Sequence, residues 1–241
     1  MAILKEHIPR YREILAMPGV ISERMLIFGY QDLMGADLPE DFAFPDLKPI
    51  LLNSGAGSVT TLDYFDKRAD LNYDMNLPVP AHEHEKYRTL LDIGCLEHLF
   101  DTRQCIENCL RMVAVGGIYM LHTCVKGYFG HGLHVFNPEG LIGSLELNNF
   151  KILSVHYTTD AGKVIQSPEY GENVIIWVVA KKLNPLESFV IPQQSIWKDY
   201  TLEGRAKKKP KGIKGLIKRP LAALWRALLS LRNDVRQYLD D

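Results

Sequence analysis

The 241-residue sequence has no run of about 20 uninterrupted apolar residues, which is the length that an apolar helix needs to cross a bilayer. We therefore expect no transmembrane helix. The opening stretch, MAILKEHIPRYREIL, is charged throughout and lacks the apolar centre of a secretory signal. No Cys-x-x-Cys pair occurs among the four cysteines, which are Cys95, Cys105, Cys109 and Cys124. This usage predicts buried free thiols in a reducing, cytoplasmic environment.

The chain has almost no net charge, with a balance of −1, but its charges are unevenly distributed. Residues 205–241 contain 11 Lys and Arg against 3 Asp and Glu, whereas the preceding residues contain 17 against 26. Leu, Val and Trp also recur at helical spacing from Leu221 to Leu239. A basic run beside an amphipathic helix is attracted to anionic membrane surfaces. Docking on a partner or on the acidic body is the alternative, and nucleic acid is disfavoured because it would not use the Leu stripe.

The stretch TLLDIGCLEHLFDTRQCIENCLRMVAVGG, residues 89–117, combines a short apolar run with a longer amphipathic one. The run that ends at Ile93 predicts a buried strand, and apolar residues from Leu96 to Val113 recur at helical spacing. Gly116-Gly117 is typical of a helix end, and a second buried strand, IYMLHTCV, follows. Strand, helix and strand in this order indicate a parallel sheet, whose ligands bind at the carboxyl ends of the strands.

The rest of the chain predicts further strands and helices around this unit. We expect an opening helix (2–16), strands at 25–28 and 58–66, and an extended segment at 69–80. We also expect a helix at 141–147 and an antiparallel pair of strands at 150–159 and 172–182. We divide the chain into an N-terminal helix (1–20), a core domain (21–185), a linker (186–204) and a basic amphipathic tail (205–241).

Three separated motifs carry a resemblance to a known family. D-I-G-x-x-E-H-L-F-D begins at Asp92, R-M-V-x-x-G-G begins at Arg111, and HGLHVFNP begins at His131. In this order they resemble class I S-adenosylmethionine-dependent methyltransferases, in a branch associated with bacterial surface-polysaccharide gene products. The resemblance covers residues 20–185. It implies an α/β, doubly wound, mostly parallel seven-stranded sheet with an antiparallel terminal strand, and S-adenosylmethionine as cofactor.

The resemblance also implies which residues bind the cofactor. The family's G-x-G-x-G is absent after the first strand, and a single glycine followed by glutamine, here Gly29 and Gln31, stands in its place. A nucleoside cofactor needs a close backbone approach at this point and an acid for its ribose hydroxyls after the second strand. Asp63 occupies the position of that acid.

Further cofactor contacts are expected from two other segments. Asp74 matches the family position beside the adenine, and Met75 can pack on the adenine ring. Gly94 and Glu97 follow the fourth strand at the same edge of the sheet. The alternative for Asp63 is a solvated strand end, for Asp74 turn formation, and for Glu97 the capping of free backbone amides.

Two histidines are the candidate catalytic groups. His98 follows the fourth strand and His131 lies in the loop after the fifth, where either could take a proton from an acceptor. The alternative for both is packing or hydrogen bonding within the loops. His131 and His134 form H-x-x-H, but the sequence indicates no third ligand, so we expect no metal site. Asp92, within the fourth strand, is assigned to structure or to the cofactor edge without preference.

The sequence leads to two hypotheses about function. The first is methyl transfer to a small molecule or glycan precursor, at the cytoplasmic membrane surface. The second is a catalytically inactive methyltransferase-like scaffold or regulator that the basic tail recruits to membranes. The missing glycines and the bulky Tyr30 favour the second hypothesis, whereas Asp63, Asp74 and the E-H pair favour the first. A nucleic-acid methyltransferase is disfavoured because the body is acidic and lacks an N/D-P-P-Y/F motif.

Overall fold

The fold is described from a computed structural model that covers residues 2–193. One compact unit spans Met1–Pro192. The basic tail, and most of the linker expected before it, lie outside the described residues, so the division of the chain into four parts stays a prediction. Among residues 2–193, every helix is too short or too polar to cross a membrane.

A seven-stranded sheet forms the centre of the molecule, in the order β4-β2-β5-β6-β9-β7-β8. Its strands are β2 (Met25–Phe28), β4 (Val59–Leu62), β5 (Tyr87–Ile93), β6 (Val113–Lys126), β7 (Phe150–Thr159), β8 (Val164–Ile165) and β9 (Val174–Lys182). The first four in spatial order are parallel, and β9 is inserted antiparallel between β6 and β7. This arrangement confirms the predicted α/β, mostly parallel sheet.

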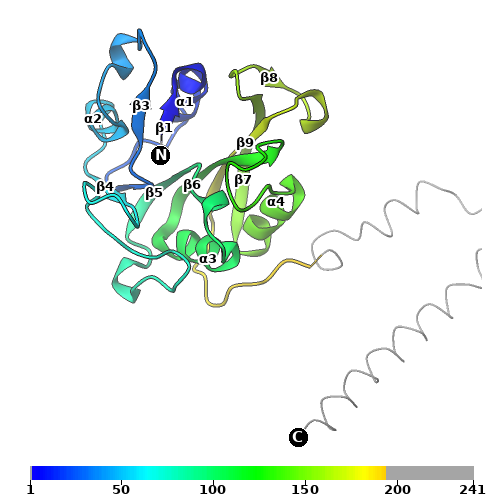
Figure 1. Cartoon of the computed structure of the whole chain (residues 1–241). Helices are drawn as coiled ribbons and strands as arrows, with labels where there is room; N and C mark the ends of the chain where they lie inside the picture. The colour runs from blue at the N-terminus through cyan, green and yellow to red at the C-terminus, as the bar shows by residue number, and fades with distance from the viewer. Residues whose placement is uncertain (1, 194–241) are drawn as a thin grey trace, which may run out of the picture. The chain divides into compact units, whose positions relative to one another are not determined.

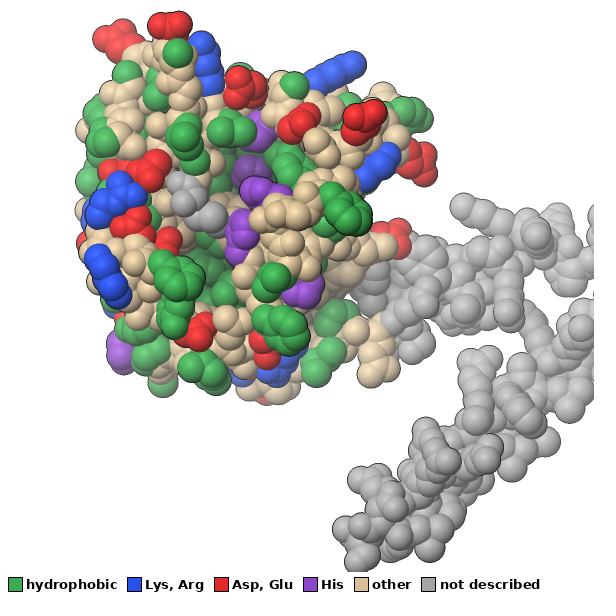
Figure 2. Space-filling model, viewed as in Figure 1, with side chains coloured by type: hydrophobic (Ala, Val, Ile, Leu, Met, Phe, Trp, Pro, Cys, Tyr) green, Lys and Arg blue, Asp and Glu red, His purple; other side chains and the backbone are tan. Residues whose placement is uncertain are grey.

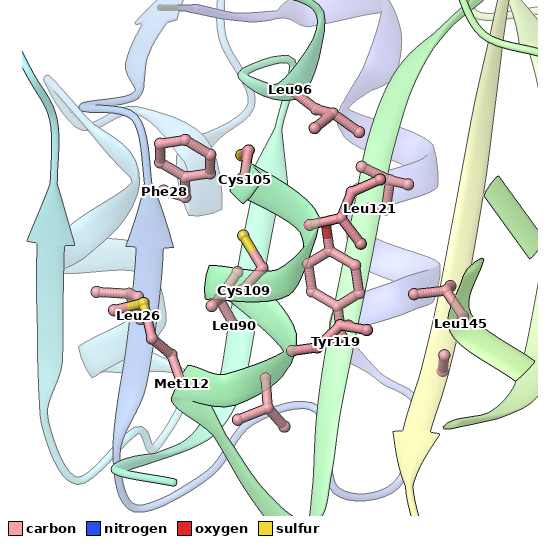
Figure 3. Close-up of a cluster of buried hydrophobic side chains, with 14 of the residues drawn as sticks. Leu26, Phe28, Leu90, Leu96, Cys105, Cys109, Met112, Tyr119, Leu121 and Leu145 are labelled. Atoms are coloured by element: carbon pink, nitrogen blue, oxygen red, sulfur yellow. The ribbon is translucent and has the colours of Figure 1, made fainter. Parts of the chain in front are cut away.

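Helices cover both faces of this sheet, as Figure 1 shows. Helices α1 (Ile8–Leu15) and α2 (Leu47–Asn53) pack on one face, and α3 (Thr102–Met112) and α4 (Pro138–Leu147) pack on the other. Cys105 and Cys109 of α3 lie against Leu90 and Tyr119 of the sheet (Figure 3). All four cysteines are free and buried, as predicted. Because strands β2 and β5 are apolar on both faces, each contributes to both cores.

The predicted opening helix begins later than expected. Ala2–Leu4 forms a strand, β1, which pairs in parallel with β3 (Asp32–Met34) in a separate two-stranded sheet. The helix α1 starts at Ile8, after a 3₁₀ turn. Ile3 is 1% exposed, so burial of this side chain and pairing with a distant strand replace the local helical preference of the segment.

The extended segment predicted at 69–80 forms no strand. It contributes an isolated bridge between Leu71 and Leu62 at the edge of β4. The Asp70 carboxylate accepts hydrogen bonds from the backbone N–H and the hydroxyl of Thr61, and so occupies a donor that a further strand would use. The seventh strand of the sheet is instead β8, at the opposite edge.

The predicted helix end at Gly116-Gly117 is also wrong. Helix α3 runs from Thr102 to Met112, and both glycines lie inside β6, near a register shift with β5. The buried ammonium of Lys182 donates to the backbone oxygens of Leu110 and Val113, at 3.0 and 2.7 Å. This side chain satisfies carbonyls at the end of the helix, which a glycine cap commonly does.

Candidate active site at the carboxyl edge of the sheet

A cavity of about 720 Å³ lies where β2, β4 and β5 end. We call it the carboxyl-edge cavity. The residues around it are Phe28, Gly29, Asp63, Tyr64, Phe65, Asp66, Asp74, Asn76, Cys95, His98, Leu99, Phe100 and Leu133. Figure 2 shows a hollow on one face of the molecule, with apolar and histidine side chains beside it. A second hollow of about 700 Å³, beside Arg88 and Gly116, lies near the start of β5. Ligands of parallel α/β sheets bind at the carboxyl edge, so the first cavity is the candidate site.

Gly29 turns the chain at the end of β2. Its φ of 81° is in the left-handed region, where residues with a Cβ are strained. Its N–H donates to the backbone oxygen of Leu62 at 2.7 Å, which joins the ends of β2 and β4. Gly29 lines the cavity, at the place where the sequence predicts a close backbone approach.

The side chain of Tyr30 is held outside the lining of the cavity. Its hydroxyl donates to Asp46 at 2.8 Å, and the guanidinium of Arg68 lies 4.1 Å from the centre of its ring. The hydrogen bond to Asp46 raises the pKa of Tyr30. The ring does not line the cavity, so the bulk of Tyr30 leaves the cavity open.

The two predicted cofactor carboxylates, Asp63 and Asp74, both line the cavity. Asp63 accepts hydrogen bonds from the backbone N–H groups of Tyr30, Phe65 and Asp66, at 2.9 to 3.0 Å. The Oδ1 atom of Asp74 accepts from the backbone and the side-chain amide of Asn76, at 2.9 and 2.8 Å. These donors fix the direction of each carboxylate, from its own loop and, for Asp63, also from the loop after β2. Carboxylate oxygens accept more than one hydrogen bond, so both groups retain capacity for a ligand.

Gln31, Met75 and Gly94 lie next to the cavity but do not line it. Gln31 is 2% exposed, and its amide donates to the backbone oxygen of Ile93 at 2.8 Å, joining the ends of β2 and β5. Met75 is packed in the core, where its backbone oxygen accepts from Asn108. Gly94 donates to the backbone oxygen of His122 at 2.7 Å. These residues connect the elements beside the cavity by hydrogen bonds.

Glu97, His98 and His131 come together at one side of the cavity. Their nearest carboxylate and imidazole atoms all lie within 4.8 Å of one another, and the two rings are 5.0 Å apart. The sequence indicates only the pair His131 and His134, and its pattern does not bring Glu97 into this group. The helix predicted to begin here starts at Thr102, and Glu97 and His98 belong to a separate 3₁₀ turn, Leu96–His98.

The environment of this group shifts the pKa of two members. Glu97 is 3% exposed and accepts from the Thr123 hydroxyl at 2.7 Å, and burial raises its pKa. Partial burial and the neighbouring His131 lower the pKa of His98, which keeps its imidazole neutral near pH 7. A neutral imidazole beside a cavity can accept a proton.

Asp92 lies in the core, away from the lining of the cavity. Its Oδ2 accepts from the Tyr119 hydroxyl at 2.9 Å, whereas Oδ1 is buried without a partner among the described residues. Burial and the charge of Glu97 raise its pKa to about 7. These contacts favour a structural role for Asp92, which does not line the cavity.

The apolar rim of the cavity was not predicted from the sequence. Phe65 and Phe100 are each 82% exposed, and Tyr64 and Leu133 are also exposed beside them. The available signal was their position: Tyr64 and Phe65 directly follow Asp63, and Phe100 follows the E-H pair. Aromatic residues next to strand-end polar residues face the same edge of the sheet.

Comparisons with known proteins agree on the fold. No protein-family profile matches the sequence, and no curated protein matches it significantly. Among solved structures, an S-adenosylmethionine-dependent methyltransferase from Mesorhizobium loti is similar, with 15% identity and a TM-score of 0.50. The match covers 73% of this chain and 98% of that one.

A candidate methyltransferase from Bacillus halodurans gives a second match at 11% identity and a TM-score of 0.50. It covers 73% of this chain and 99% of the other. At these identities the similarity concerns the fold. The chain therefore has the Rossmann-like α/β fold of S-adenosylmethionine-dependent methyltransferases.

Proposed function

We propose that the protein transfers a methyl group from S-adenosylmethionine to a small molecule or a glycan precursor. The observation that carries this proposal is the open carboxyl-edge cavity, which Gly29, Asp63 and Asp74 line while Tyr30 is held outside. The fold supports the proposal but does not fix the reaction, because one fold hosts many functions.

The residues of the cavity suit this cofactor. Asp63, at the end of β4, would accept hydrogen bonds from the ribose hydroxyls, and Asp74 would bind at the adenine end. The turn at Gly29 lets the methionine part approach the backbone. When bound, S-adenosylmethionine supplies an electrophilic methyl group, and in-line transfer requires mainly that donor and acceptor are positioned without water between them.

His98 is the proposed general base for an acceptor that must lose a proton. It lines the cavity, and its lowered pKa keeps the ring neutral at physiological pH. As the acceptor gains the methyl group, its proton would pass to a ring nitrogen of His98. His131, 5.0 Å away between ring centres, would orient His98 or contact the acceptor.

The apolar rim favours an acceptor with an apolar part. Exposed aromatic side chains such as Phe65 and Phe100 bury apolar surface when a ligand covers them, at roughly 25 cal/mol per Å². Together with the basic tail, this rim suggests an acceptor, such as a lipid-linked glycan precursor, at the cytoplasmic face of an anionic membrane. Sedimentation with anionic liposomes tests the location, and equal pelleting after removal of residues 205–241 would refute it.

Calorimetric titration of the full chain with S-adenosylmethionine and S-adenosylhomocysteine tests the proposal itself. We expect one binding site for each. Absence of heat at millimolar ligand would favour the alternative, an inactive scaffold recruited to membranes. The observation that favours this alternative is that Asp63 already accepts three backbone hydrogen bonds.

A further inference from the structure

We propose that Glu97, His98 and His131 form a binding site for one divalent transition-metal ion. Each residue offers one ligand atom, and the three atoms lie within 4.8 Å of one another. Two imidazoles and one carboxylate suit Zn²⁺, Mn²⁺, Fe²⁺ and Co²⁺ better than the all-oxygen sites that Mg²⁺ and Ca²⁺ prefer.

The three side chains are close to the spacing that a metal requires. Metal–ligand distances of about 2.0–2.2 Å place two ligands of one ion at most about 4 Å apart. Rotation of the two histidine side chains, both of which are exposed, can close the remaining gap. Among residues 2–193, no group hydrogen-bonds to a ring nitrogen of His98 or His131, so their lone pairs are available.

The backbone already holds the two contributing segments together. The backbone oxygen of Glu97 accepts hydrogen bonds from the N–H groups of Leu133 and His134, at 2.8 and 3.1 Å. Gly132 packs so closely that a Cβ there would lie 2.8 Å from the same oxygen. The loop that carries His131 is therefore fixed on the turn that carries Glu97 and His98. Metal binding would therefore not require the two segments to change their relative position.

Glu97 also has a supporting partner of the kind that metal ligands have. The Thr123 hydroxyl donates to Oε2 at 2.7 Å, and such partners orient a ligating carboxylate. The Glu97 side chain is 3% exposed, and buried charged groups in proteins are commonly paired or coordinate a metal. His134, by contrast, has its Nε2 atom 3.3 Å from the backbone oxygen of Phe100 and lies outside the cluster.

A role for the metal in catalysis rests on the proposed function, whereas metal binding does not. Three protein ligands leave coordination positions open for an oxygen of the acceptor. A metal bound there would lower the pKa of an acceptor hydroxyl, whose proton would then pass to solvent water in the open cavity. His98 would in that case be a metal ligand instead of the general base.

The test is calorimetric titration of the full chain, after treatment with a chelator, with Mn²⁺ and separately with Zn²⁺. We expect one site per chain. His131→Ala should weaken binding about tenfold or more, because loss of even a supporting residue costs 10- to 100-fold. His134→Ala, in the same loop, is the matched control and should bind as the unmodified chain does. Residues 194–241 contain no His or Cys, so the tail offers no competing nitrogen or sulfur ligand.

A spectroscopic measurement identifies the ligands. Co²⁺ should give visible absorption bands that change in His98→Ala and His131→Ala but not in His134→Ala. Thr123→Val should weaken binding, and Thr123→Ser, which keeps the hydroxyl, should restore it. No binding at millimolar metal, or equal binding by the His131 and His134 variants, would overturn the proposal.

Cofactor binding is measured separately in the presence of EDTA. One outcome is that S-adenosylmethionine binds in the presence of EDTA while no metal binds to the EDTA-free chain. In that case the metal site is wrong and the proposed function stands. The reverse result would retain the metal site and reject the cofactor.

Discussion

The carboxylate of Asp63 accepts a hydrogen bond of 2.9 Å from the backbone N–H of Tyr30. This bond ties the loop after β2 to the end of β4, next to the bond between Gly29 and Leu62. The backbone of Tyr30 is thereby fixed, and its side chain contacts Asp46 and Arg68 instead of lining the cavity. A single glycine is therefore sufficient to leave the cavity open, although the sequence contains no G-x-G-x-G after β2.

Asp63→Asn should weaken binding of S-adenosylmethionine about tenfold or more, because a hydrogen bond to a charged group contributes about 1.5–3 kcal/mol. Calorimetry measures the change, and thermal unfolding shows whether the variant is folded. The control is Asp41→Asn, which removes a surface ion pair with Arg12 and should leave the affinity unchanged. Equal affinities of a folded Asp63→Asn and the unmodified chain would exclude the ribose role of Asp63.

Gly29→Ala should lower the free energy of unfolding by about 1–2 kcal/mol, because a Cβ at a φ of 81° is strained. Denaturant unfolding measures this change. Gly140→Ala is the matched control, since it lies within α4 with open space around its Cα and should raise helix stability by about 0.5–1 kcal/mol. If both variants changed stability in the same direction, the conformational role of Gly29 would be wrong.

Tyr30→Phe should cost about 0.5–1.5 kcal/mol of stability, since it removes the hydrogen bond to Asp46. The affinity for S-adenosylmethionine should change by less than about twofold, because the ring does not line the cavity. Both values come from the same preparation, by denaturation and calorimetry. A large gain in affinity would show that Tyr30 obstructs the ligand.

Asp92→Asn should stabilise the protein more at pH 8 than at pH 5. The folded pKa of about 7 lies above the unfolded value near 3.9, so the folded state binds the proton more tightly. The contribution of protonated Asp92 to the free energy of unfolding is complete below about pH 4 and is lost as the pH rises to 7. Asn at this position is neutral throughout, so its contribution does not change with pH. The advantage of the variant should therefore grow by about 2–3 kcal/mol between pH 5 and 8. Denaturation curves measure the free energy of unfolding of both proteins. An equal difference between variant and unmodified chain at the two pH values would contradict the shifted pKa.

The sequence predicts most of the central sheet because its strands are short apolar runs. Residues 25–28 and 150–159 are strands as expected, and the strand expected at 172–182 is β9, Val174–Lys182, which pairs antiparallel with β7. Besides the segment at 69–80, two expectations failed where distant residues decide the outcome. Ala2–Leu4 is a strand because it pairs with residues 32–34, and Lys182 replaces the glycine cap expected for α3.

The sequence predicts only part of the candidate site, because it locates the ends of strands but not the contacts between distant loops. Asp63 lines the cavity because it directly follows β4, and Asp74 lines it because it lies three residues after Leu71, which bridges to Leu62 at the end of β4. The approach of Glu97 to His131 depends on backbone hydrogen bonds between two loops more than thirty residues apart. Periodicity carries no information about such contacts, so the sequence could not predict that Glu97 lies beside His131.

A crystal structure of the full chain with S-adenosylhomocysteine would show where the nucleoside binds. We expect it in the carboxyl-edge cavity, with ribose oxygens on Asp63 and the adenine next to Asp74. An empty cavity at saturating ligand, or the ligand at the opposite edge beside Arg88, would contradict this expectation.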